Sequence, residues 1–159
     1  MVSVAFVCLG NICRSPMAEA VFADTVNKAG YSDKFHIDSF GTGAYHIGDS
    51  PDSRSVQTCN KHNVPINHAA QQIKPAHFGE FDYILAMDRN NLANLQRIAP
   101  KSAKAKVQLF GDYRRDSSWV KKIVEDPYYG GISGFEENFE PFTVFRRIFL
   151  DSIVYDYDL

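Results

Sequence analysis

The chain has 159 residues, of which 45% are hydrophobic and 23% charged, and its formal net charge at pH 7 is -2. This composition excludes a disordered chain, and a chain of this length needs only one hydrophobic core. The charge balance gives no electrostatic reason to expect nucleic-acid binding, because the local basic clusters are typical of solvated surface. These clusters are Lys101, Lys104 and Lys106, and Arg114 with Arg115.

Hydropathy and cysteine content limit where the protein works. No apolar run approaches the roughly 18 residues that span a bilayer, and residues 1–7 lack the basic flank of a secretory signal. Three cysteines are too few for a disulfide scaffold in a chain of this size, so we expect free thiols in a reducing compartment. We therefore predict a single domain over residues 1–159 in the cytoplasm.

The first predicted element is a buried strand over residues 2–7, an apolar run rich in β-branched residues. A loop containing glycine follows directly. Ser15 then provides an N-cap with Pro16 at the first helical position, and apolar residues recur at helical spacing until Gly30. The pattern predicts a strand, a loop and a helix in succession.

The same alternation continues along the chain. Strands are expected over residues 35–40, 83–87 and 107–110, and helices over about 50–62 and 90–98. Ser133 with Glu136 forms the pattern of a capping box for a final helix. That helix contains Pro141, which either kinks it or delays its regular part to about residue 140.

Continuous apolar strands separated by helices favour a parallel sheet that is covered on both faces. We therefore predict an α/β fold, a three-layer sandwich whose four-stranded parallel sheet has the order 2-1-3-4. Ligands of such sheets bind beyond the carboxyl ends of the strands, which places the loop CLGNICRS, residues 8–15, at the expected site.

The composition of this loop favours anion binding. Gly10 and Asn11 tolerate positive φ, so that successive N–H groups can point into one concavity, and the following helix adds its positive end. Such a cradle, together with the guanidinium of Arg14, favours the thiolate form of Cys8. The planar guanidinium of Arg14 can bind two phosphoryl oxygens at once. The nucleotide-binding pattern GxxxxGKS/T is absent, and CxxxxC matches structural zinc spacing poorly, so a nucleotide-binding loop and a structural zinc site are both weak alternatives.

The segment Cys8-Leu-Gly-Asn-Ile-Cys-Arg14-Ser15-Pro16 is an instance of the signature C-x5-R-S/T and closely resembles the low-molecular-weight protein tyrosine phosphatases. Further segments agree with that resemblance along nearly the whole chain, among them Asp38-Ser39, Pro51-Asp52 with Arg54, residues 81–88 and residues 125–130.

The resemblance implies a mechanism. Cys8 attacks phosphorus, and Arg14 holds the phosphoryl oxygens together with the backbone amides of the loop, from Leu9, Gly10, Asn11, Ile12 and Cys13 onward. Asp126 protonates the leaving group and then activates water against a phosphocysteine intermediate, so the cycle needs no metal or organic cofactor. Taken alone, Asp126 with its following proline is typical of a surface turn.

The resemblance also assigns secondary roles. Asn11, Ser15, Ser39 and His68 would support the loop and the thiolate. Ile12, Tyr45, Tyr128 and Tyr129 would wall a slot for an aromatic phosphate ester. Cys13 would form a reversible disulfide with Cys8 under oxidation. Cys59 lies in a predicted helix and is interpreted as a packing residue.

The implied partners are phosphotyrosine-containing proteins or small aryl phosphates, with no nucleic acid and no membrane span, and we expect a monomer or a weak dimer. Two other classes share the anion-binding loop. A redox enzyme similar to the arsenate reductases needs further downstream cysteines, of which only Cys59 is present. A binding module that only senses phosphate has no use for the acid Asp126.

Overall fold

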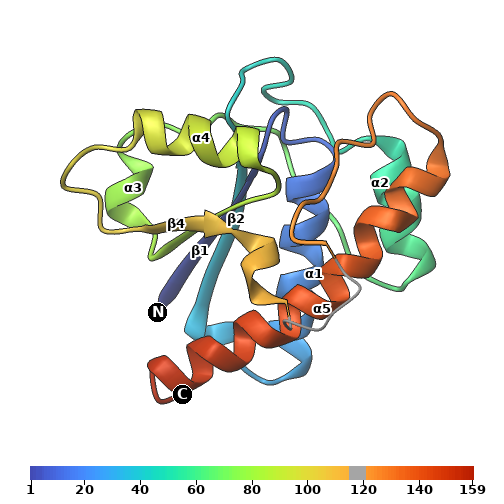
Figure 1. The fold of residues 1–159 in the computed structure, drawn as a ribbon. Coiled ribbons are helices and arrows are strands. Elements are labelled where there is room, and N and C mark those ends of the chain that lie inside the picture. The colour runs from blue at the N-terminus through green and yellow to red at the C-terminus, as the bar shows by residue number, and fades with distance from the viewer. Residues whose placement is uncertain (115–120) are drawn as a thin grey trace.

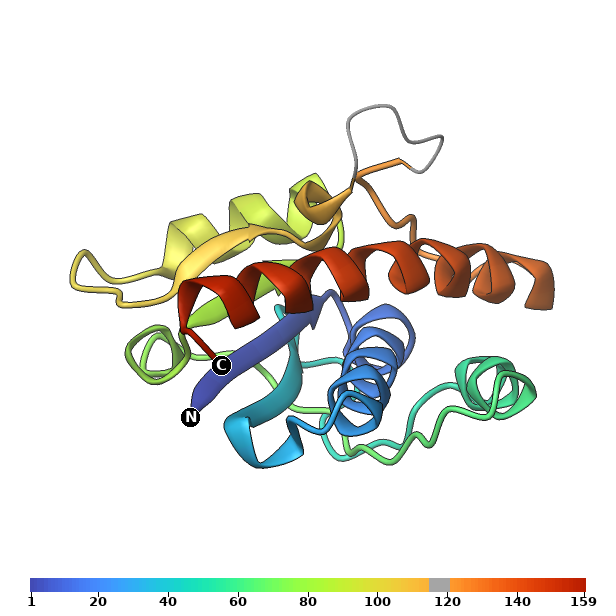
Figure 2. The ribbon, with the colours of Figure 1, turned by 90° about the horizontal axis from the view of Figure 1, so that it is seen from below.

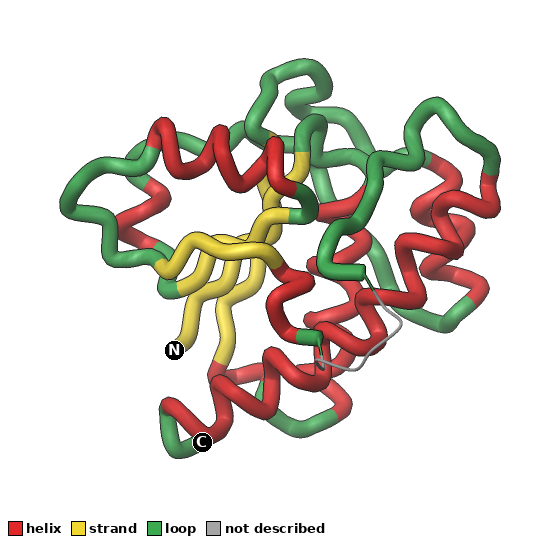
Figure 3. The backbone as a smooth tube through the Cα atoms, in the orientation of Figure 1, coloured by secondary structure: helices red, strands yellow, loops and turns green. Residues whose placement is uncertain are grey.

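A computed structural model describes residues 1–114 and 121–159, so Arg115 of the second basic cluster lies outside the described residues. Its four strands are β1 (Val2–Cys8), β2 (Phe35–Gly41), β3 (Tyr83–Ala86) and β4 (Lys106–Leu109). All pair in parallel, in the order β2-β1-β3-β4 (Figures 1 and 3). The predicted sheet and its strand order are confirmed.

Helices cover both faces of the sheet (Figures 1 and 2). Helices α1 (Arg14–Lys28) and α5 (Ile132–Asp156) lie on one face, and α3 (His77–Glu80) and α4 (Arg89–Ile98) lie on the other. The short α2 (Ser53–Lys61) packs against α1 and α5. Two 3-10 turns, η1 (Ser32–Lys34) and η2 (Phe110–Tyr113), precede β2 and follow β4.

The central strand explains why both faces are covered. Along β1, Val4 and Phe6 belong to the cluster that α1 and α5 complete, whereas Ala5 and Val7 belong to the cluster under α3 and α4. Alternate side chains of a strand point to opposite faces, so a strand that is apolar throughout must be buried on both. Because β1 is held from both faces, the position of its last residue, Cys8, is fixed at the carboxyl edge of the sheet.

Two helix starts differ from the prediction. Helix α1 begins at Arg14 with Cys13 as its N-cap, because the Ser15 hydroxyl is directed to the loop and makes no cap bond. Helix α5 begins at Ile132 with Gly131 as its N-cap and no capping box, because the Glu136 carboxylate binds His62 at 2.9 Å.

Helix α5 is continuous through Pro141, from Ile132 to Asp156. This rules out the alternative in which the regular part of the helix starts only at about residue 140. Buried phenylalanines anchor the helix on both sides of the proline, Phe139 before it and Phe142 after it. None of the helices in the described parts of the chain has the length and apolar character to cross a membrane.

Candidate active site

The loop between β1 and α1 curls around the sulfur of Cys8. The backbone N–H of Asn11 donates to Cys8 Sγ at 3.3 Å, and the Ser15 hydroxyl oxygen lies 3.0 Å from the same sulfur. Helix α1 begins directly behind the loop, so its positive end faces the sulfur as well. A backbone N–H, a hydroxyl and a helix terminus therefore surround the sulfur, and this arrangement stabilises an anion.

Asn11 holds the loop in shape. It has a φ of 59°, a conformation that costs most residues other than glycine about 1 kcal/mol or more, and it is 1% exposed. Its amide nitrogen donates to the hydroxyls of Ser15 at 2.8 Å and Ser39 at 3.0 Å. Its amide oxygen accepts from the backbone N–H of Gln71 at 2.9 Å and from His68 Nε2 at 2.7 Å. All four hydrogen-bonding positions of the amide are thus satisfied.

A second layer of polar groups lies behind Asn11. The Ser39 hydroxyl donates to Glu19 Oε1 at 2.6 Å, and His68 Nδ1 lies 3.3 Å from the same carboxylate oxygen. Burial raises the pKa of Glu19 to about 7 and lowers the pKa of His68. Possible metal-binding atoms of Glu19, Asp38 and His68 come within 4.8 Å of one another, but each takes part in this network, which gives the cluster a structural purpose.

The guanidinium of Arg14 lies at the other end of the loop and is 2% exposed. Its Nη1 donates to Asp88 Oδ2 at 2.6 Å and to the carbonyl oxygen of Val124 at 3.0 Å, and its Nη2 lies 3.6 Å from Asp126 Oδ2. Its Nε–H is buried and has no hydrogen-bond partner. A buried donor without a partner is costly, so this N–H is a position for an anionic ligand.

The carboxylate of Asp126 enters the site from the loop before α5. Its Oδ1 accepts a hydrogen bond from the backbone N–H of Tyr128 at 3.0 Å, and its side chain is 40% exposed. Cys8, Arg14 and Asp126 line one cavity of about 540 Å³, a volume typical of small-molecule sites. The remaining lining residues are Leu9, Gly10, Ile12, Cys13, Tyr45, His46, Tyr128 and Tyr129.

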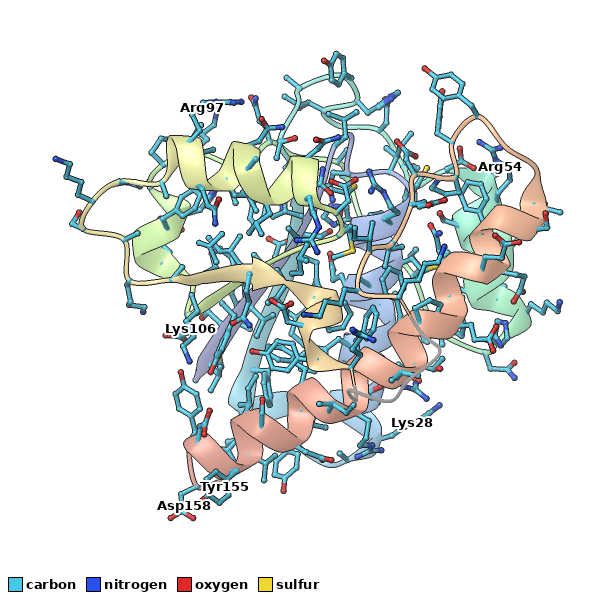
Figure 4. The ribbon with its side chains drawn as sticks, in the orientation of Figure 1. Lys28, Arg54, Arg97, Lys106, Tyr155 and Asp158 are labelled. Carbon is cyan, nitrogen blue, oxygen red and sulfur yellow. The ribbon has the colours of Figure 1, made fainter. Side chains whose placement is uncertain are left out.

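Helix α2 connects this loop, the acid loop of residues 124–131, to the anion-binding loop. The backbone N–H of Asp52 donates to the carbonyl oxygen of Ile12 at 2.8 Å. Asp52 in turn binds Arg54 through two hydrogen bonds of 3.0 Å. Arg54 donates to the carbonyl oxygens of Gly130 at 2.7 Å and Tyr128 at 2.9 Å, and it lies between α2 and the acid loop in Figure 4. The ion pair of Asp52 and Arg54 therefore links the two loops, in addition to the contacts of Arg14 with Val124 and Asp126.

Comparison with known proteins gives this geometry a family. Residues 3–150 match the family described as low molecular weight phosphotyrosine protein phosphatase. The chain belongs to this family. The phosphatase of that name from Saccharomyces cerevisiae is 54% identical over 150 residues, which cover 94% of this chain and 93% of the yeast protein. The human phosphatase of the same name is 44% identical and covers 94% of both chains.

Solved structures agree with that assignment. The chain is similar to a protein tyrosine phosphatase from Entamoeba histolytica with a TM-score of 0.91 and 32% identity, over the whole of both chains. The predicted family and activity are thus confirmed, and the chain is a cysteine-dependent tyrosine phosphatase of the low-molecular-weight type.

The structure of the phosphatase brings together the residues for which the sequence predicted a role in catalysis, loop support or the substrate pocket. The predicted wall residues Ile12, Tyr45, Tyr128 and Tyr129 line the cavity, and the predicted supporting residues lie beneath its floor. Cys13 also lines the cavity, and burial raises the pKa of its thiol to about 12.

Cys59 lies away from the cavity lining. It is fully buried in the core between the helices, as expected for a packing residue.

Sequence reasoning missed several groups that position the site. Asp88 and the Val124 carbonyl hold Arg14. Gln71 binds Asn11 directly, and Glu19 supports Asn11 through Ser39 and His68. Asp88 follows β3, which pairs with β1, so the carboxyl edge of a parallel sheet was a signal for it. A backbone carbonyl and a residue of the first helix carry no comparable signal.

Gly10 and Asn11 both tolerate positive φ, and in the structure only Asn11 adopts it. The absence of a side chain at Gly10 matters for packing instead, because a Cβ at this position would lie 3.0 Å from His46 Cδ2. His46, a further lining residue that the sequence did not single out, occupies that space.

Proposed function

We propose that this phosphatase hydrolyses phosphotyrosine and related aryl phosphates with Cys8 as nucleophile, Arg14 as phosphate clamp and Asp126 as proton donor. The observation that carries the proposal is the shared cavity, which Cys8, Arg14 and Asp126 all line, together with the buried Nε–H of Arg14 that has no hydrogen-bond partner. A phosphoryl dianion placed there meets donors on the loop side, and its ester oxygen meets the acid.

The first half of the reaction transfers the phosphoryl group to sulfur. A lone pair of Cys8 Sγ forms the S–P bond while the bond from phosphorus to the phenolic oxygen breaks, and that oxygen takes the proton of Asp126. Loop N–H groups and Arg14 stabilise the charge on the equatorial oxygens, as donors fixed in advance do in other phosphoryl and acyl transfers. Phosphocysteine and a free phenol result.

The second half releases phosphate. Water attacks phosphorus in line with the S–P bond, Asp126 accepts its proton, and the sulfur leaves as a thiolate. The Ser15 hydroxyl, 3.0 Å from the sulfur, and the Asn11 N–H, 3.3 Å from it, then stabilise the leaving sulfur. Every group in this cycle belongs to the chain, so we propose a reaction without metal or organic cofactor.

The test is turnover of p-nitrophenyl phosphate and phenyl phosphate in the absence of added thiol and metal. Cys8→Ser should abolish both activities. Asp126→Asn should lower kcat for phenyl phosphate by about 10² to 10⁴, and less for p-nitrophenyl phosphate, whose better leaving group needs less protonation. Equal losses on the two esters would remove the acid role from Asp126, and residual activity dependent on added thiol would indicate a redox enzyme.

The proposal also covers the location, the oligomeric state and the substrates of the phosphatase. We propose that the phosphatase works in the cytoplasm, as a monomer that dimerises at most weakly, on protein substrates or small aryl phosphates. The free thiols of Cys8, Cys13 and Cys59 support the proposed location, because thiols persist in a reducing compartment. Fractionation of cells and sedimentation over a range of concentrations test location and oligomeric state.

We also propose that Cys13 protects the site under oxidation. Both cysteines line the same cavity, so a sulfenic acid formed on Cys8 by peroxide can condense with the Cys13 thiol, releasing water and leaving a disulfide. Peroxide-treated protein should regain its activity on addition of dithiothreitol, and Cys13→Ala should regain much less. Equal recovery would contradict the role.

A further inference from the structure

Large apolar side chains that are exposed to solvent gather at the mouth of the cavity. Ten such side chains are exposed among the described residues, and four of them belong to the two chain ends. The other six lie on the loops that form the cavity or directly beside them, and we call them the apolar collar: Leu9, Tyr45, Ile47, Tyr128, Tyr129 and Ile132. Figure 1 shows the turn of residues 45–48 and the acid loop at the same end of the molecule.

Four collar residues line the cavity itself, and two lie beyond it. Ile47 is 58% exposed and follows the lining residue His46, and Ile132 is 47% exposed and begins α5 three residues after Tyr129. Neither lines the cavity, so neither contacts a phosphotyrosine ring held there. An apolar patch of this kind usually marks a contact with another protein.

Among the described residues, the basic groups at and beneath the mouth are already paired with carboxylates. His46 Nδ1 lies 3.3 Å from Asp49 Oδ2, Arg54 binds Asp52, and Arg14 binds Asp88. The Arg54 guanidinium also donates to two carbonyl oxygens of the acid loop. An acidic residue next to a phosphotyrosine would have to compete with these contacts, whereas an apolar residue finds exposed partners.

We propose that the apolar collar binds large apolar residues that flank the phosphotyrosine of a protein substrate, and so selects apolar over charged sequence contexts. This inference rests on the proposed function, because the phosphotyrosine in the cavity is what brings the flanking residues to the collar. Residues in an extended peptide are about 3.3 Å apart, so the immediate neighbours of the phosphotyrosine reach the rim. Burial of apolar area then supplies selectivity.

The experiment compares three phosphotyrosyl peptides of equal length, flanked on both sides by Leu and Val, by Glu, or by Arg, with p-nitrophenyl phosphate as the reference substrate. We expect kcat/KM to be about tenfold higher for the apolar peptide than for the Glu peptide, with a ratio that does not depend on salt. Ile47→Asn should lower kcat/KM about fivefold for the apolar peptide, through KM, and leave p-nitrophenyl phosphate turnover unchanged.

Tyr155→Asn is the matched control, because this exposed side chain lies at the far end of α5 (Figure 4), and it should change none of the ratios. Equal rates on the three peptides, or a preference for the Glu or Arg peptide that weakens as salt is added, would contradict the proposed selectivity of the apolar collar. Either result would leave the proposed function intact. If Ile47→Asn converts a dimer to a monomer without changing the peptide ratio, the collar joins two copies and the inference is wrong. A wild-type protein inactive on p-nitrophenyl phosphate would overturn both proposals.

Discussion

Asn11 combines two tasks that usually fall to different residues. It adopts a φ of 59°, which glycine would adopt at lower cost, and its amide joins Ser15, Ser39, His68 and Gln71. Glycine could follow the backbone but could not form the network. The side chain therefore explains why a residue other than glycine is useful here.

We expect Asn11→Ala to lower the free energy of unfolding by about 2 to 4 kcal/mol, because it leaves buried hydroxyl and amide groups unpaired in addition to the backbone strain. We also expect kcat for p-nitrophenyl phosphate to fall by about 10-fold to 100-fold, since Ser15 loses the donor that orients it toward the sulfur. Urea unfolding and steady-state kinetics measure the two effects.

Asn63 provides the matched control for that change. It has a φ of 58° but is exposed, so Asn63→Ala should cost only the backbone term, about 1 kcal/mol, and leave kcat unchanged. Equal effects of the two substitutions on stability and kcat would mean that the network around Asn11 contributes nothing.

The three cysteines should differ sharply in reactivity. Burial raises the pKa of both Cys13 and Cys59 to about 12, so at pH 7 each is a thiolate in only roughly one molecule in 10⁵. As the pH rises toward 12 both become reactive. Iodoacetate at pH 7 should therefore alkylate Cys8 alone, inorganic phosphate should protect it, and mass spectrometry of peptides should find the label there. Label on Cys13 at pH 7 that phosphate does not prevent would contradict this assignment.

At the level of elements, α2 holds the acid loop through Arg54. The guanidinium lies 4.5 Å from the ring of Phe135 on α5, binds Asp52 and donates to the carbonyl oxygens of Tyr128 and Gly130. This pattern uses four N–H donors of one planar guanidinium, and a lysine ammonium cannot reproduce it. Arg54 is thus a positioning residue for the neighbouring Asp126.

We expect Arg54→Lys to lower kcat about tenfold for phenyl phosphate but less than threefold for p-nitrophenyl phosphate, because a displaced acid matters most for the poorer leaving group. The ratio between the two esters separates a displaced acid from a general loss of folded protein. Arg97→Lys, on α4 where Arg97 binds only Asn94 among the described contacts, should leave the ratio unchanged. An unchanged ratio in Arg54→Lys as well would show that the ion pair does not position Asp126.

The helix boundaries show where sequence patterns mislead. Ser15 and Ser133 both match capping patterns, but neither caps a helix in the structure. The Ser15 hydroxyl contacts Cys8 and Asn11 instead. Glu136, the partner expected for Ser133, binds His62 at the C-terminal end of α2. Such contacts between segments distant in sequence override local preferences. The central strand β1, in which only Ser3 is polar, was predictable because burial on both faces requires apolar residues at nearly every position.

At the level of the whole molecule, the aromatic core links the first strand to the last helix. Phe110 is fully buried and contacts the rings of Phe6, Phe142, Phe145 and Phe149 at centroid distances of 5.0 to 6.1 Å. These rings come from β1, η2 and α5, so one side chain joins elements from both ends of the chain.

We expect Phe110→Ala to lower the free energy of unfolding by about 3 to 5 kcal/mol, the usual cost of a cavity left by a buried aromatic ring. KM for p-nitrophenyl phosphate should stay the same in the protein that remains folded, because Phe110 does not line the cavity. Denaturant unfolding and kinetics at low temperature measure these effects. A loss below 1 kcal/mol would show that the core collapses into the space.

The signature segment placed the proposed nucleophile and the proposed clamp in one short stretch of sequence, because these residues are close neighbours in the chain. The groups that hold them are scattered, and this limited the sequence analysis. Asp88, the Val124 carbonyl and Gln71 come close to the loop only in the folded structure. The apolar pattern indicated the sheet, but side-chain pairing between distant loops could not be read from it.

That scatter has a consequence for synthesis of the protein. When a ribosome has released the first forty residues, the nascent segment already contains the sulfur, the arginine and Ser39, but the groups at positions 68, 71, 88 and 124 do not yet exist. An incomplete chain therefore carries the sulfur and the arginine without the groups that hold Asn11 and Arg14 in place. A product that ends before residue 124 should be unable to act on phosphorylated proteins, because it lacks both the Val124 carbonyl that holds Arg14 and the proposed acid, Asp126.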